Sequence, residues 1–79
     1  METNWKFLTV VYENDDYLIH GLSFWSCLLK TTGERVSVKD PLYGQSHKMK
    51  IFEIEHEGTM TRYAAGEFSN CVWGLYEEV

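Results

Sequence analysis

The last third of the chain, KMKIFEIEHEGTMTRYAAGEFSNCVWGLY, constrains the fold more than any other stretch. It is rich in β-forming residues and has one break, His56-Glu57-Gly58-Thr59, which places a glycine where a three-residue loop needs a left-handed residue. We therefore predict a β-hairpin of Lys48–His56 and Thr59–Ala65, closed by a type I turn with a G1 bulge. A tight corner and a final strand, Cys71–Tyr76, follow.

Small residues lie between this hairpin and the last strand. Ala64-Ala65-Gly66 is a run along which a backbone or a large side chain can approach closely. In the last strand we expect alternate side chains to face the core. The inward set is Cys71, Trp73 and Leu75, and the outward set is Val72, Gly74 and Tyr76.

The first strand of the hairpin has apolar residues on both faces. Met49 and Ile51 share one parity, whereas Phe52 and Ile54 share the other. A β-bulge near Ile51-Phe52 would bend the strand and turn all four side chains toward one core. The alternative is a regular strand that is covered on both faces, and the sequence favours neither over the other.

Trp5–Tyr12 is predicted to be the first strand, and both of its faces are largely apolar. Such a strand is central in its sheet or lies under a cover on each side. In a chain of 79 residues the second cover could be another copy of the same chain. This pattern therefore predicts a homodimer.

Residues 15–30 fit two structures. A helix is indicated by leucine and tryptophan at spacings of 4, 3 and 4 and by Gly33 as a stop. Two strands, Tyr17–Leu22 and Phe24–Lys30, are favoured by the interior glycine and by the aromatic and β-branched residues. In the second case a turn at Lys30-Thr31-Thr32-Gly33-Glu34 joins Ser26–Lys30 to a strand Arg35–Lys39.

Together these elements predict one domain over residues 1–79, since single cores usually occupy about 50 to 200 residues. The fold class is mainly β, a single antiparallel sheet of five to six strands curled into a roll or open barrel. The alternative is an α+β fold with one helix at about residues 15–30.

No motif for catalysis, metal binding or nucleotide binding stands out. Three histidines and two cysteines, Cys27 and Cys71, lack the close C-x-x-C or H-x-x-x-H pairing of zinc sites. We therefore expect no enzyme activity, no metal and no cofactor. The first residues lack a signal-peptide pattern and no apolar run is long enough to span a bilayer, so we expect a soluble, cytoplasmic protein without membrane contact.

We expect a small protein-interaction module that self-associates, or that acts as an inhibitor or adaptor of another protein. Three Trp, five Tyr and four Phe are many for this length, and proline and glycine hold Leu42 and Tyr43 in the one long loop. These side chains either fold over the core as a lid or stand out as a contact knob. The expected partner-binding residues are Leu42, Tyr43, Trp73 and Tyr76.

The alternative function is single-stranded nucleic-acid binding by a small β-barrel, which needs a basic groove with stacking aromatics. The candidate basic residues are Lys30, Lys39, Lys48 and Lys50. The net charge of −5 opposes phosphate binding. The segments AAGEFSN and VWGLY are similar to the ends of small bacterial or bacteriophage proteins, without indicating a family.

Overall fold

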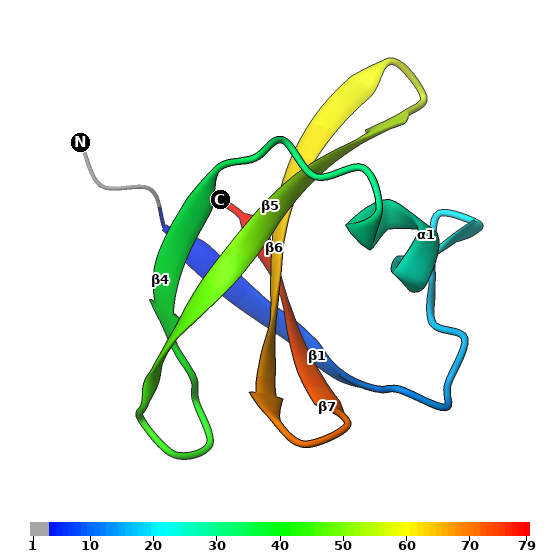
Figure 1. The fold of residues 1–79 in the computed structure, drawn as a ribbon. Coiled ribbons are helices and arrows are strands. Elements are labelled where there is room, and N and C mark those ends of the chain that lie inside the picture. Colours follow the sequence, from blue (N-terminus) through cyan, green and yellow to red (C-terminus); the bar gives the residue numbers. More distant parts are fainter. Residues whose placement is uncertain (1–3) are drawn as a thin grey trace.

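The computed structural model describes residues 4–79 and is mainly β, as the sequence predicts. The elements in chain order are β1 (Trp5–Tyr12), β2 (Leu18–Ile19), β3 (Leu22–Ser23), α1 (Phe24–Leu28), β4 (Arg35–Lys39), β5 (Ser46–His56), β6 (Thr59–Ser69) and β7 (Val72–Glu78). Five strands form one antiparallel sheet in the order β1-β7-β6-β5-β4, while β2 and β3 form a separate two-stranded sheet. The large sheet curls into an open roll, which confirms the predicted architecture (Figure 1).

The inside of the roll holds one apolar core. Its buried members are Val38, Met49, Ile51, Ala64 and Tyr76, with Trp5, Phe7, Val36 and Phe68 packed against them. Strands β1 and β4 lie at opposite ends of the sheet, yet both contribute side chains to this cluster. The sheet therefore bends around the inner core.

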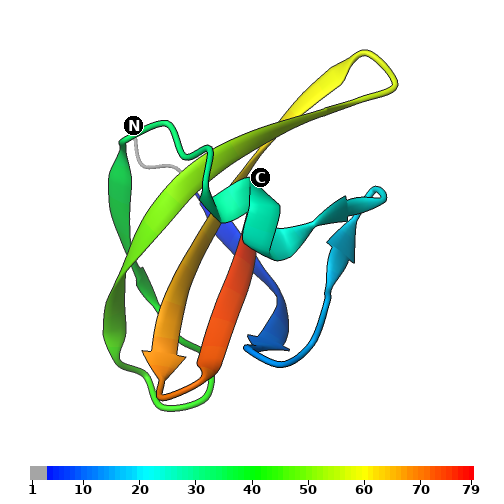
Figure 2. The same ribbon diagram turned by 45° about the vertical axis from the view of Figure 1, so that its right-hand side comes forward.

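A second core lies on the outer side of the sheet, beneath α1 and the β2–β3 hairpin (Figure 2). Its buried members are Val11, Ile19, Phe24, Phe52, Ile54, Tyr63, Ala65 and Leu75. Phe24 is fully buried, and its ring meets those of Phe52 and Trp73 edge to face at centroid distances of 6.5 and 6.4 Å. This ring anchors α1 to the sheet.

Strand β5 runs through both cores. Its pairing with β6 continues without a register shift from Lys50 to His56, so the bulge considered near Ile51-Phe52 is wrong. The strand is regular instead, as in the alternative, and each face is covered along a different part of it: the inner face up to Ile51 and the outer face from Phe52 on. The two parities of apolar residues therefore reflect a change of covered face halfway along a regular strand.

Strand β1 lies at the edge of the sheet and not at its centre. A register shift between Phe7 and Thr9 lets Phe7 face the inner core and Val11 the outer core. The two-sided apolar pattern thus arises from a β-bulge, which changes the parity of the strand. Leu8 and Tyr12 remain exposed, at 37% and 51%.

The prediction of a strand over Phe24–Lys30 is wrong, and so is the hairpin turn that was to join it to β4. The segment forms the short helix α1, and only Leu18–Ile19 and Leu22–Ser23 are strands within Tyr17–Lys30. Left-handed φ angles at His20 and Gly21, 51° and 82°, close the β2–β3 turn. Chain reversal at this turn rules out one continuous helix and directs Phe24 into the core.

The β5–β6 hairpin is confirmed, but its turn type differs from the prediction. His56 pairs directly with Thr59, and Glu57 and Gly58 have φ angles of 51° and 80°. Two successive left-handed residues make a two-residue type I′ turn, which matches the twist of the flanking strands. The predicted inward position of Cys71 is also wrong, since it is exposed at the β6–β7 turn with a φ of 65°.

Candidate functional site

Asp40 organises the loop between β4 and β5. Its side chain is buried and accepts hydrogen bonds from the backbone N–H groups of Leu42, Tyr43 and Gln45, and it pairs with His47 Nε2 at 2.7 Å. Burial alone would raise the pKa of Asp40, but these hydrogen bonds, led by that of Tyr43, hold it below its usual value. The loop is therefore a preorganised Asx-type turn.

The four residues expected to bind a partner separate into two groups. Leu42 and Tyr43 stand out from the loop with 58% and 71% exposure, so they form a knob and not a lid. Trp73 is half-buried against α1. Tyr76 is only 2% exposed and donates its hydroxyl to the Lys39 carbonyl, so its placement on a contact surface is corrected.

The second half of β5 has a free outer edge. Ile51 donates its N–H to the Glu34 carbonyl at 3.3 Å, and its carbonyl accepts from the Thr32 N–H at 2.9 Å. Thr32 and Glu34 both precede β4 in the chain. Alternate residues of an antiparallel strand direct their backbone groups to the same side. Glu53 and Glu55 therefore direct their N–H and carbonyl groups to the edge of the sheet that faces away from β6. Within residues 4–79 they have no strand partner at this edge.

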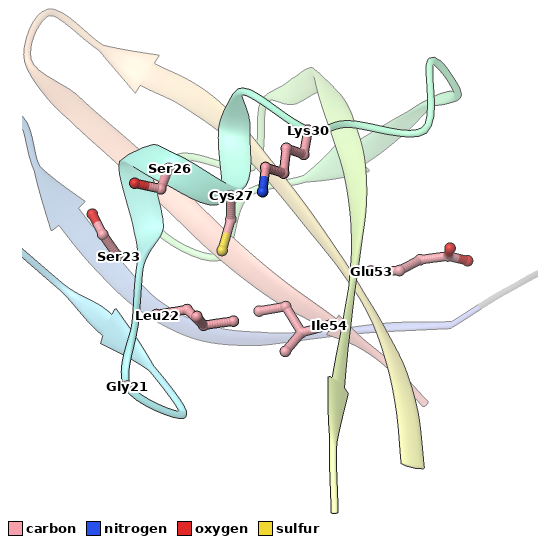
Figure 3. Close-up of a pocket in the computed structure, with 8 residues that line it drawn as sticks. All are labelled: Gly21, Leu22, Ser23, Ser26, Cys27, Lys30, Glu53 and Ile54. Carbon is pink, nitrogen blue, oxygen red and sulfur yellow. The ribbon is translucent and has the colours of Figure 1, made fainter. Parts of the chain in front are cut away.

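A pocket of about 250 Å³ lies between this edge and α1, and we call it the edge pocket. The residues lining it are Gly21, Leu22, Ser23, Ser26, Cys27, Lys30, Glu53 and Ile54. In Figure 3, Leu22 and Ile54 point toward one another, whereas the Glu53 side chain points away, so Glu53 borders the pocket through its backbone. Burial raises the pKa of the Cys27 thiol, with Lys30 opposing, which keeps this wall uncharged.

Arg62 occupies the inner side of the sheet near the end of the roll. Its guanidinium lies 2.8 Å from Glu34, 3.1 Å from Glu78 and 3.7 Å from Glu53. The Glu53 side chain is thus engaged on the side of the sheet opposite the edge pocket. This arrangement leaves the backbone of Glu53 as its contribution to the pocket.

A basic face covers the outer side of β4 and the first half of β5. It consists of Arg35, Lys39, Lys48 and Lys50, all exposed. Alternation along the strands places them on one side, and Arg35 pairs directly with Lys50. Three of these residues were predicted from the sequence. Arg35 was not, because only the strand register places it beside the lysines. Lys30 lies apart, at the edge pocket.

His20, His56 and the exposed Cys71 thiol contact neighbouring side chains of the protein. His20 stacks on His56 at 4.0 Å, and its Nε2 lies 3.4 Å from the Tyr63 hydroxyl. A hydrogen bond to the Glu13 side chain raises the pKa of the Cys71 thiol, which disfavours the nucleophilic thiolate. No group of three or more potential metal ligands occurs among the described residues.

Comparison of the chain with protein-family models, with curated proteins and with solved structures found no match. In the part of the chain that the structure describes, no helix has the length and apolar character needed to cross a membrane. Function is therefore inferred from the edge pocket and from the basic face.

Proposed function

We propose that the protein is a non-enzymatic interaction module that binds an extended segment of a partner protein by adding it as a strand to β5. The observation that carries this proposal is the unpaired outer edge of Glu53 and Glu55 beside an apolar pocket. An exposed strand edge is a template for main-chain pairing, and pockets for alternate side chains supply specificity.

The edge pocket defines the chemistry of the segment. Glu53 and Glu55 offer two N–H donors and two carbonyl acceptors, which is enough to hold a short extended stretch. The walls formed by Leu22 and Ile54 suit an apolar side chain, and the Lys30 ammonium at the rim suits a neighbouring carboxylate. The expected ligand is thus an extended segment with an apolar residue next to an acidic one.

Self-association is the second part of the proposal. Strand β1 is an eight-residue edge strand, and Glu13 donates its N–H to the Cys71 carbonyl on the β7 side. By alternation, Val10 directs its backbone groups and Tyr12 its N–H to the free side, whereas the Tyr12 carbonyl already accepts from the Asp15 N–H. A second copy could pair at this free side, antiparallel about a twofold axis. A mass by light scattering that rises toward the dimer with concentration supports this, and a constant monomer mass rejects it.

We further propose that the module works in the cytoplasm as an inhibitor or adaptor of a cellular protein. The two cysteines are free thiols, which is typical of proteins kept in a reducing compartment.

A phage-displayed library of random linear peptides tests the strand-addition proposal. Selected peptides should share an apolar residue beside an acid, and Glu53→Pro should abolish their binding because it removes the outward N–H. Glu53→Ala is the matched control, since it loses the same contact with Arg62 but keeps the N–H, and it should bind normally.

A second pair of variants covers the case in which the proline change disturbs the fold. Leu22 and Leu18 lie on the same small hairpin with 48% and 54% exposure, but only Leu22 lines the edge pocket. Leu22→Asp should therefore abolish peptide binding and Leu18→Asp should not. Equal binding by Leu22→Asp and the unsubstituted protein, or selection of no peptide at all, would overturn the proposal.

A further inference from the structure

The basic face is unusual in a chain with net charge −5. Within residues 4–79, none of its four basic side chains has an ion-pair partner. The ion pairs of this part of the chain are made by Arg62 and by two histidines. Arg35 and Lys50 stand directly opposite one another across the two strands. Like charges in this position destabilise a sheet, so a bound polyanion would relieve a repulsion that the free protein bears.

A hollow of about 280 Å³ lies beside these cations. Its lining comprises Arg35, Lys48, Lys50, Ala65, Gly66, Glu67 and Trp73. Ala65 and Gly66 give it a low floor, and the half-buried indole of Trp73 forms a wall next to the charges. The hollow therefore combines phosphate-binding groups with an aromatic surface.

We propose that the basic face binds single-stranded nucleic acid. The backbone phosphates would lie along Lys48 and Lys50, which are two residues apart on one strand and so about 7 Å apart. A base would enter the hollow and lie against Trp73. A duplex keeps its base faces stacked inside and could use the cations alone, so the aromatic wall favours the single strand.

The surrounding charge limits how the strand binds. Glu67 borders the hollow beside Trp73, its neighbour across β6 and β7, and repels phosphate from that end. Phosphates are therefore expected at the Arg35, Lys48 and Lys50 end and a base at the other. With about three phosphate contacts, raising salt from about 50 to about 200 mM should weaken binding roughly 20-fold.

Fluorescence anisotropy with a labelled oligothymidylate, and with the corresponding oligouridylate, tests this proposal. The double variant Lys48→Gln/Lys50→Gln should lose at least about tenfold in affinity at low salt. Lys48→Gln alone should reduce the salt dependence, whereas Lys6→Gln, an equal loss of charge on β1, should leave both quantities unchanged. The indole N–H resonance of Trp73 should shift on binding, and that of Trp5, which packs against the inner core on the opposite face of the sheet, should not.

Three results would overturn the proposal. They are the absence of binding at about 50 mM salt, equal losses in Lys48→Gln and Lys6→Gln, and binding to vesicles of anionic lipid with none to either oligonucleotide. The edge pocket plays no part in this site, so failure here leaves the strand-addition proposal standing, and the reverse also holds.

Discussion

The two halves of β5 differ in nearly every property although they form one regular strand. From Ser46 to Lys50 the strand pairs with β4, buries Met49 inside the roll and presents lysines on the outer face of the sheet. Beyond Ile51 it pairs with β6 alone, buries Phe52 and Ile54 beneath α1, and has a free outer edge. Both candidate sites follow from this division, the basic face from the first half and the edge pocket from the second.

A short chain thus obtains two different surfaces from one strand. Core side chains cover the inner face of β5 up to Ile51 and the outer face from Phe52 on. Each half of the strand therefore has one uncovered face. Where the cover ends, charged side chains or backbone groups meet the solvent.

The largest effect is expected at the cover of the second half. Phe24→Ala removes the fully buried ring that holds α1, which should cost about 3–5 kcal/mol in the free energy of unfolding. Urea denaturation measures this cost, and near-UV circular dichroism should report the loss of the Trp25–Trp73 packing. Leu29→Ala, at an 85% exposed position, is the control and should change stability by under about 0.5 kcal/mol.

A pH-dependent effect is expected at the loop that leads into the first half. The folded pKa of Asp40 is depressed below 3.8, so its stabilisation is present above that pH and is lost as pH falls through the folded pKa. Asp40→Asn should lower the thermal midpoint at neutral pH. The gap between the two proteins should narrow in acid, and a gap that stays constant with pH would contradict the role assigned to the carboxylate.

The close approach at Gly66 tests the packing of the first half against β6. A Cβ at this position would clash with Met49 Sδ and lie 3.0 Å from the Lys48 carbonyl oxygen. Gly66→Ala should therefore destabilise the protein by about 1–3 kcal/mol through overpacking. A stabilising effect in a urea titration would show that the inner core has room that the structure does not indicate.

The smallest effect on stability is expected at the knob of the β4–β5 loop. Tyr43 is 71% exposed, so Tyr43→Ala should change the free energy of unfolding by less than about 0.5 kcal/mol and leave the far-UV spectrum intact. It should weaken any partner or dimer contact that the knob makes. Loss of folded structure would instead assign Tyr43 to the core.

Most strands of the sheet could be predicted from the sequence because the residues between them favour turns. Gly58 marks the β5–β6 hairpin, and the small residues at Gly66 do admit Met49 closely. The turn type was missed because Glu57 adopts a left-handed φ of 51° that few non-glycine residues adopt. Cys71 was misplaced for the same reason, with a φ of 65°.

Helix α1 could not be predicted with its bounds from local pattern. It has only five residues, too few to be stable alone, and begins with Phe24 and Trp25, which favour strands in isolation. Burial of Phe24 against Phe52 stabilises it, and that contact depends on the tertiary fold. The two candidate sites could not be predicted for the same reason. Arg35 lies beside the lysines only through the strand register, and the edge pocket forms only when α1 lies beside β5.

Amide hydrogen exchange along β5 tests the division of the strand most directly, because it needs no ligand and no substitution. Phe52 and Ile54 pair with Tyr63 and Thr61 of β6, whereas the N–H groups of Glu53 and Glu55 face the free edge. We predict that the two glutamate amides exchange faster than those of Phe52 and Ile54 by on the order of 100-fold or more. Equal protection of all four amides would contradict the free edge, and with it the proposed strand addition.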